Sequence, residues 1–192
     1  MEQESLVAIY FIGLFFAEIL RLPHRISRFR NRHFWRAAKK ATRLTERIVL
    51  VFVFLGIWIL PFISSFTPWL NGFDFGLPHW VSLLAVLVFL IGLIIRLIAQ
   101  LTLSRSWSFT VETSEVHRLI DHGIYSFSRH PIYVSLIFWA VAQPGLIQNY
   151  VAGFSGAVAV ILVWLIRVPR EEELMVEVFG DDYGYYMDRT GR

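Results

Sequence analysis

Five stretches of this chain are almost free of charged side chains, and they lie at residues 5–22, 48–66, 80–101, 132–146 and 150–168. Hydrophobic residues make up 56% of the sequence and charged residues only 17%. One soluble core cannot bury so many apolar side chains unless several helices are apolar on every side. Apolar stretches of about 20 residues can cross a membrane as helices. We therefore predict an all-α integral membrane protein with about five transmembrane helices.

The fourth stretch, residues 132–146, is the shortest. At about 1.5 Å per residue, its helix covers roughly 22 Å, less than the ~30 Å of a hydrocarbon core. Gln143-Pro144-Gly145 and Gln148-Asn149 separate it from the fifth stretch. Because these residue types favour turns, the last two helices are predicted to form a tight hairpin. Such a hairpin brings residues 102–131 and 167–192 to the same face of the membrane.

The basic residues are unevenly distributed, which predicts the orientation. Ten of the 18 Lys and Arg residues lie within residues 21–47, with Glu46 as the one acid there, whereas residues 67–79 contain none. Basic loops stay on the cytoplasmic side, so residues 102–131 and 167–192 are predicted to be cytoplasmic. Beside a membrane span, the basic stretch is expected to contact anionic lipid headgroups rather than nucleic acid.

Several kinds of site are absent from the sequence. Cysteine does not occur, so disulfides, thiolate nucleophiles and Cys-ligated metals are excluded. No His-x-x-x-His pair, P-loop, Gly-x-Gly-x-x-Gly or Gly-x-Ser-x-Gly motif occurs either. The sequence therefore predicts no metal site, no nucleotide-binding Rossmann domain and no serine hydrolase.

Two polar segments flank the predicted hairpin. The first, residues 117–133, leads into the fourth helix, where Pro131 suits the first helical turn and leaves Arg129 and His130 at its N-terminus. The second follows the fifth helix and contains the acidic run 171–173. Taken alone, Arg129 could anchor a helix end and the glutamates could form a solvated face. Three acids beside a membrane surface nevertheless call for a cationic partner, such as Arg129 or Arg167.

The motifs in these segments resemble those of a known family. Residues 117–143 carry His117, Gly123-x-Tyr125, Arg129-His130-Pro131-x-Tyr133 and Trp139, and residues 167–189 carry Arg167, Glu171-Glu172, Phe179-Gly180-Asp181-Asp182-Tyr183, Tyr186 and Arg189. This combination resembles the isoprenylcysteine carboxyl methyltransferases over roughly the last 80 residues. The wider superfamily also contains phospholipid N-methyltransferases and sterol reductases.

The resemblance implies S-adenosylmethionine as methyl donor and the α-carboxylate of a prenylated cysteine as acceptor. The residues implied to bind the cofactor are His117, Tyr125, Arg129, His130, Tyr133, Glu171 and Glu172. Arg129 suits the donor carboxylate, the glutamates its ammonium or ribose, and the tyrosine rings its adenine or sulfonium. For the catalytic cation that fixes the acceptor carboxylate, Arg189 is the first choice and Arg167 the second.

The same reasoning predicts the layout of the whole chain. Residues 1–192 form one membrane domain, with three N-terminal spans in residues 1–101 and a catalytic region in residues 102–192. The lipid substrate comes from the bilayer, so we expect a lateral gap between helices. The natural acceptor and the oligomeric state stay open. The alternatives are a lipid amine N-methyltransferase with a glutamate as base, a nicotinamide-dependent sterol-type reductase, and a membrane scaffold without activity.

Overall fold

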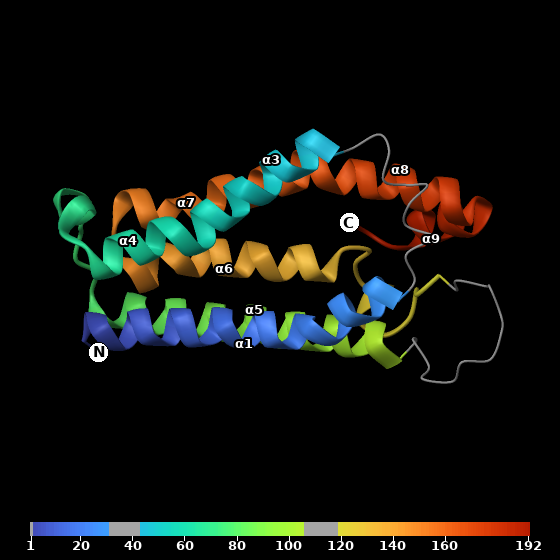
Figure 1. Ribbon diagram of the computed structural model, residues 1–192. Coiled ribbons are helices and arrows are strands. Elements are labelled where there is room, and N and C mark those ends of the chain that lie inside the picture. The colour runs from blue at the N-terminus through green and yellow to red at the C-terminus, as the bar shows by residue number, and fades with distance from the viewer. Residues whose placement is uncertain (1, 31–42, 106–118) are drawn as a thin grey trace.

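The computed structural model describes residues 2–30, 43–105 and 119–192, without the side chains of residues 20–30, 43–46, 104 and 105. Within these ranges the secondary structure is helical, apart from an isolated β-bridge between Asp74 and Asn149. The long helices run side by side in one elongated bundle (Figure 1). The predicted all-α fold is therefore confirmed for the described part of the chain.

The first three apolar stretches form long helices. The first is α1 (Gln3–Arg30). The second is a continuous run of α3 (Arg43–Phe54), the π turn η1 (Leu55–Ile59) and α4 (Leu60–Phe66). The third is α5 (His79–Arg105), which follows the 3-10 turn η2 (Pro68–Phe73). Helix α1 continues beyond its predicted end at residue 22 into the basic stretch. Pro61 is the second residue of α4, just after the π turn. A wider turn at this point accommodates a residue that has no backbone N–H.

Helices α6 (Pro131–Ile147) and α7 (Tyr150–Leu162) form the predicted hairpin. Helix α6 runs through Pro144 and ends at Gln148, whose φ of 51° lies in the left-handed region. Asn149 then caps α7, because its Oδ1 accepts hydrogen bonds from the backbone N–H groups of Val151 and Ala152 at 3.1 and 3.0 Å. The turn therefore lies at Gln148-Asn149, and Pro144 is part of the helix.

The fifth stretch extends further than the sequence predicted. Helix α7 continues through the π turn η4 (Val163–Arg167) into α8 (Val168–Phe179). Gly180 ends α8 with a φ of +56°, a conformation that favours glycine, and the chain then turns back as α9 (Asp181–Arg189). Because a π turn holds an extra residue, side chains beyond η4 face a different direction from those of α7. Helix α8 can therefore direct its glutamates toward the start of α6.

Glycines allow the central helices to approach closely. A Cβ atom on Gly92 of α5 would lie 2.6 Å from Cδ1 of Trp139, and one on Gly145 would lie 2.4 Å from Cβ of Ala85. Both contacts join α5 to α6. Helices in lipid pack through such small residues because no hydrophobic force distinguishes a neighbouring helix from a lipid tail.

A buried polar network fixes the hairpin against the second helical run. The side-chain amide of Gln143 donates to the carbonyl oxygens of Gly56 at 2.9 Å and Ala152 at 2.6 Å. The Ser155 hydroxyl also donates to Gly56 at 2.6 Å, and the Tyr10 hydroxyl donates to the next carbonyl, that of Ile57, at 2.7 Å. The carbonyl groups of Gly56 and Ile57 belong to π turn η1. Three helices therefore hold this turn in place.

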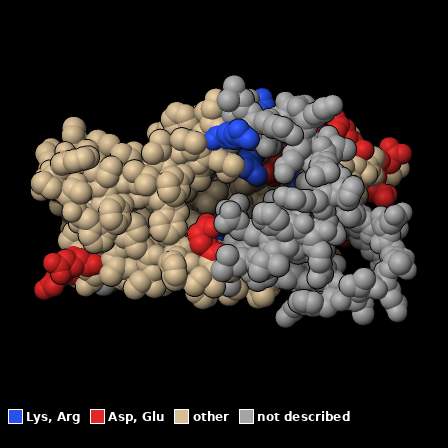
Figure 2. Space-filling view, viewed as in Figure 1, with Lys and Arg blue, Asp and Glu red and all other residues tan. Residues whose placement is uncertain are grey.

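Three helical runs in the described residues are long and apolar enough to cross a membrane, namely Arg47–Phe66, His79–Leu103 and Tyr150–Phe179. Helix α6 is equally apolar but has only 17 residues, as predicted for the fourth stretch. Uncharged side chains cover most of the face shown in Figure 2, and the described Lys and Arg side chains visible there lie in the half nearer α8 and α9. The bundle therefore fits a membrane protein.

Candidate active site

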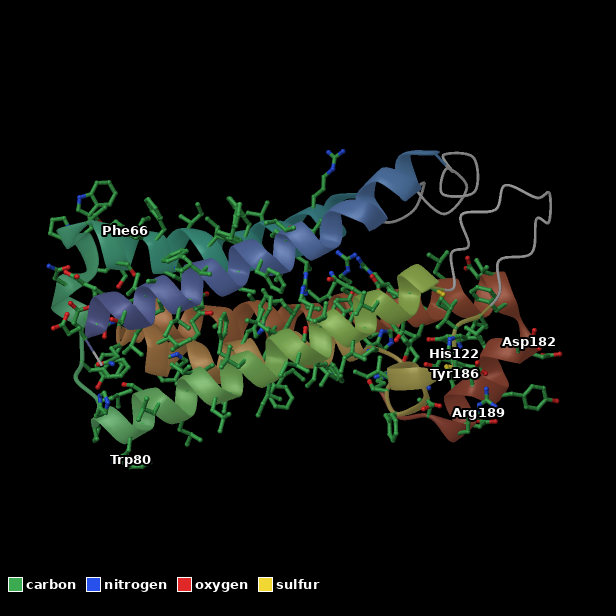
Figure 3. All side chains as sticks on the ribbon, turned by 90° about the horizontal axis from the view of Figure 1, so that it is seen from below. Phe66, Trp80, His122, Asp182, Tyr186 and Arg189 are labelled. Carbon is green, nitrogen blue, oxygen red and sulfur yellow. The ribbon has the colours of Figure 1, made fainter. Side chains whose placement is uncertain are left out.

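The polar segments meet at one end of the bundle. The start of α6, the end of α8, helix α9 and the 3-10 turn η3 (Gly123–Ser126) all lie there (Figure 1). In Figure 3, His122, Tyr186 and Arg189 lie at this end, whereas Phe66 and Trp80 lie at the other. Residues that are more than 60 positions apart thus lie in contact, as between Tyr186 and Tyr125, whose separation is 61. The predicted meeting of the two segments is observed.

The start of α6 positions two of the predicted residues. Pro131 occupies the first turn of the helix, so Arg129 and His130 precede it, as the sequence predicted. Their backbone N–H groups already have partners, however. The N–H of Arg129 donates to the carbonyl of Gly191 at 2.9 Å, and that of His130 to the hydroxyl of Ser128 at 3.2 Å. The side chains therefore remain the groups that these two residues can offer a ligand.

A buried carboxylate lies at the centre of this end. Glu172 is only 6% exposed. Its Oε1 lies 3.0 Å from Nη2 of Arg129 and 3.2 Å from Nε2 of His130, and its Oε2 accepts from Nε and Nη2 of Arg192 at 2.9 and 2.6 Å. We call these four residues the Glu172 cluster. Two arginines compensate the cost of burying the carboxylate.

His130 links this cluster to its surroundings. Burial lowers the pKa of His130, and Arg129 adds to the effect, while Glu172 and Glu171 oppose it. The imidazole is therefore neutral near pH 7 and donates its Nε2 hydrogen to Glu172. Its ring stacks on that of Tyr133, with centroids 5.6 Å apart and an interplanar angle of 24°. The guanidinium of Arg129 also donates to the carbonyl of Met187 at 3.2 Å.

A second cluster surrounds the preceding glutamate. The Tyr133 hydroxyl donates to Oε1 of Glu171 at 2.6 Å, and Nε of Arg167 donates to the Tyr133 oxygen at 2.7 Å and to the same Glu171 oxygen at 2.9 Å. We call these three residues the Arg167 cluster. Both contacts of Arg167 use Nε, so its two terminal nitrogens have no protein partner among the described residues.

Three buried tyrosines form the wall between η3 and α9. The Tyr186 hydroxyl donates to the backbone carbonyl of Tyr125 at 2.6 Å, and the rings of Tyr183 and Tyr186 meet edge to face at 5.7 Å. Burial raises the pKa of both Tyr183 and Tyr186 to about 12, and it also raises that of Tyr125. These phenols are therefore neutral and offer aromatic faces and hydroxyl groups rather than charge.

The predicted residues divide into three groups. Arg129, His130, Tyr133, Arg167, Glu171 and Glu172 are brought together in the two clusters, and Tyr125 lies in the tyrosine wall. Arg189 is at the outer edge, where it forms an ion pair with Asp121 and its side chain is 61% exposed. His117 lies outside the described residues.

An apolar groove of about 640 Å³ runs between α6 and α7. It is lined by Ile137, Ala140, Val141, Pro144, Phe154, Ala157, Val160, Ile161, Trp164 and Leu165. Ile137 lies one turn after Tyr133 on α6, and Trp164 lies about one turn before Arg167. The groove therefore ends about one helical turn from the Arg167 cluster. It fits the lateral gap that the sequence led us to expect.

Sequence reasoning missed Arg192 and the carbonyl groups of Met187 and Gly191. A single arginine near the end of a polar segment forms no recognisable pattern, and backbone carbonyls leave no trace in a sequence. The one available signal is charge balance, because a buried glutamate requires cationic partners. The structure supplies that count in the two arginines that contact Glu172.

Comparisons with known proteins agree with the motifs. The sequence model of the isoprenylcysteine carboxyl methyltransferase family matches residues 84–177. The chain is 32% identical over 111 residues to protein-S-isoprenylcysteine O-methyltransferase A of Arabidopsis thaliana, a match that covers 57% of this chain and 56% of the relative. It is 30% identical over 113 residues to the human protein-S-isoprenylcysteine O-methyltransferase, covering 58% and 40%.

A third relative is the protein-S-isoprenylcysteine O-methyltransferase of Tribolium castaneum, 29% identical over 115 residues, with 59% of this chain and 41% of the relative covered. The chain thus spans about half the length of these relatives or less. The resemblance that the motifs predicted is confirmed: through residues 84–177, from α5 to α8, this chain is related to the isoprenylcysteine carboxyl methyltransferase family.

Proposed function

We propose that the chain is a membrane methyltransferase that uses S-adenosylmethionine to methylate the α-carboxylate of a prenylated cysteine or a similar lipophilic carboxylate. The observation that carries this proposal is an apolar groove that ends about one helical turn from the Arg167 cluster, with the Glu172 cluster next to it. A lipid tail requires an apolar groove, and the polar groups of donor and acceptor require charges of both signs. The names of the relatives support the same activity.

The Glu172 cluster fits the amino-acid part of S-adenosylmethionine. Glu172 suits an ammonium group, and the guanidinium of Arg129 suits a carboxylate. Nε of Arg129 is buried and has no partner among the described residues, which leaves a donor for such a carboxylate. The rings of Tyr125 and Tyr183 offer apolar surface for the adenine. When bound, the cofactor supplies the methyl group.

The Arg167 cluster suits the acceptor. A carboxylate is already ionised at neutral pH, so the reaction needs no general base. The chain instead has to hold the carboxylate in line with the methyl group and to exclude water. Tyr133 and Glu171 both contact Nε of Arg167, which fixes the guanidinium and directs its terminal nitrogens to a ligand. We favour Arg167 over Arg189 because the groove ends about one helical turn from Arg167, whereas Arg189 pairs with Asp121.

The proposal includes five membrane spans, with the candidate site on the cytoplasmic side. Three long apolar runs, the shorter α6 and the 28-residue α1 lie side by side and supply five crossings (Figure 1). The end of α1 and the start of α3, which belong to the basic residues 21–47, lie toward the end of the bundle that holds the clusters (Figure 1), and basic loops stay in the cytoplasm. The donor would then arrive from water and the lipid from the bilayer.

Cysteine labelling tests this orientation, because the chain has no cysteine of its own. We expect Ser128→Cys to resist a membrane-impermeant maleimide in intact cells and Asn71→Cys to react. Both should react after permeabilisation, which controls for accessibility. Labelling of Ser128→Cys but not of Asn71→Cys in intact cells would reverse the proposed topology.

A transfer assay tests the activity. Purified protein in detergent would receive methyl-labelled S-adenosylmethionine and N-acetyl-S-farnesylcysteine as acceptor. We expect label in a product that releases methanol in alkali, as a methyl ester does and an N-methyl amine does not. With phosphatidylethanolamine as acceptor instead, label that alkali does not release as methanol would identify an amine methyltransferase. Binding of a nicotinamide dinucleotide but not of S-adenosylmethionine would identify a reductase.

A further inference from the structure

The last residues of α9 and those that follow it cross the Glu172 cluster. We call residues 187–192 the C-terminal strap. Arg129 holds it at two points, because its guanidinium donates to the carbonyl of Met187 at 3.2 Å and its backbone N–H to that of Gly191 at 2.9 Å. Arg192 makes the third attachment, to Glu172. Thr190, between these points, is buried. The strap is thus attached directly to the carboxylate proposed to bind the donor.

The Glu172 carboxylate is fully occupied by protein groups. Arg129 and His130 contact Oε1, and Arg192 donates two hydrogen bonds to Oε2. A carboxylate accepts about four hydrogen bonds. Another cation can therefore reach Glu172 only if one of these three residues moves.

Arg192 is the partner that can leave most easily. Its side chain is 46% exposed, so water can solvate the guanidinium once it has moved. The side chains of Arg129 and His130 are only 11% and 8% exposed. Arg129 is also held by the two carbonyl groups of the strap. An arginine that keeps about half of its side chain in water loses little when its ion pair opens.

A cavity lies beside this ion pair. It has a volume of about 400 Å³ and is lined by Pro169, Glu172, Glu173, Val176, Met187 and Arg192. Val176 and Met187 offer apolar surface, while Glu172 and Glu173 supply negative charge. This combination suits a short aliphatic chain that ends in an ammonium group, such as the amino-acid part of an S-adenosyl compound.

We propose that Arg192 gates the donor site, because its guanidinium and the α-ammonium of an S-adenosyl ligand are alternative partners of Oε2 of Glu172. The proposal rests on the proposed function, which assigns Glu172 to the donor. Each binding event then releases the strap from Glu172, and each departure restores the ion pair. Arg192 thereby lowers the apparent affinity for the donor and its product, since only the open fraction binds.

Calorimetry on the full chain in detergent tests the gate with two ligands. S-adenosylhomocysteine carries the α-ammonium, whereas 5′-methylthioadenosine lacks the amino-acid part. We expect Arg192→Ala to bind S-adenosylhomocysteine roughly threefold or more tightly and 5′-methylthioadenosine without change. Arg47→Ala is the matched control, because it removes the same charge from an exposed position on α3. It should leave both affinities unchanged.

Other outcomes would overturn the gate. Weaker binding of S-adenosylhomocysteine to Arg192→Ala would mean that Arg192 holds the ligand. An unchanged affinity, or an equal change in affinity for both ligands, would mean that the strap has only a structural role. Arg192→Gln, which keeps most of the side chain, replaces Arg192→Ala if that variant does not fold, with the same expected direction. The proposed function fails separately if the wild-type chain binds neither ligand, or if Glu172→Gln leaves S-adenosylhomocysteine binding intact.

Discussion

Glu171 and Glu172 are neighbours in the sequence, but their surroundings differ. Glu172 contacts Arg129, His130 and Arg192, and its side chain is 8% exposed. The Glu171 side chain is 29% exposed and contacts one cation, Arg167, together with the Tyr133 hydroxyl. Successive residues on a helix point about 100° apart, so one short acidic run serves two different sites.

The difference between the two clusters shows how the chain can separate its two ligands. The Glu172 cluster joins α6 and α8 to the C-terminal strap, whereas the Arg167 cluster joins α6 and α8 at the end of the apolar groove. Under the proposed function, the first cluster holds the donor and the second receives the carboxylate of the lipid. The stacked rings of His130 and Tyr133 connect them. A methyl group would then pass between two sites that share one pair of helices.

The largest expected effect is on donor binding by the Glu172 cluster. Arg129→Ala and Glu172→Ala should each weaken S-adenosylmethionine binding by ~1–3 kcal/mol, the range for a lost charged hydrogen bond. Glu171→Ala should weaken it less, because Glu171 belongs to the other cluster. Calorimetry in detergent measures all three, and thermal unfolding confirms that each variant is folded. Equal donor affinity in folded Arg129→Ala, Glu172→Ala and wild-type protein would remove the donor from this cluster.

The next effect should be on turnover and should single out the Arg167 cluster. Arg167→Lys keeps the charge but loses the planar guanidinium, and with it the bidentate contact to a carboxylate. We expect kcat to fall roughly tenfold or more, because about 1.4 kcal/mol of lost positioning in the transition state corresponds to a factor of ten. Donor affinity should persist. Steady-state kinetics with N-acetyl-S-farnesylcysteine and labelled donor measure both quantities.

Arg189 provides the comparison for this prediction. The sequence made it the first choice for the acceptor cation, but the structure shows it paired with Asp121 at an exposed position. Arg189→Lys and Arg189→Ala should therefore lower kcat less than Arg167→Lys does. The reverse order, with full activity in Arg167→Lys and loss in Arg189→Ala, would make Arg189 the acceptor cation.

The sequence was most informative for features that depend on a local pattern of residue types. Apolar periodicity and length predicted the helices, and turn residues predicted the hairpin. The Arg-His-Pro-x-Tyr and Glu-Glu motifs, together with Arg167, predicted six of the residues in the two clusters. Long-range contacts were less accessible, because nothing in the local pattern pairs Arg189 with Asp121 or Arg192 with Glu172. The extension through η4 to Phe179 was also missed, since the polar residues after 168 end the apolar pattern without ending the helix.

A smaller effect should appear when the groove is partly filled. Ala157 lines the groove, whereas Val158, the next residue, is exposed on α7 and does not line it. Ala157→Phe should raise the KM for N-acetyl-S-farnesylcysteine roughly three- to tenfold, because an added ring competes with the lipid tail for space. Val158→Phe, the matched control, should leave KM unchanged. Equal KM values for the two variants would mean that the lipid tail does not bind in this groove.

The smallest effect should be a pH dependence of the stability of the protein. We expect it to come from the Glu172 cluster, because His130 belongs to that cluster and the Arg167 cluster contains no histidine. Burial lowers the pKa of His130 below its ordinary value near 6.5, against the opposing pull of Glu172 and Glu171. As the pH falls below 6.5, the unfolded chain therefore takes up a proton at this histidine before the folded chain does. The contribution of His130 to the stability of the fold is complete above pH 6.5 and is lost as the pH falls. The melting temperature of the wild-type protein should thus exceed that of His130→Gln most at pH 7, and the gap should narrow toward pH 5. If the difference in melting temperature widens on acidification, folded His130 binds the proton and forms an ion pair with Glu172. The proposed donor site would then carry one more positive charge than it does with a neutral imidazole.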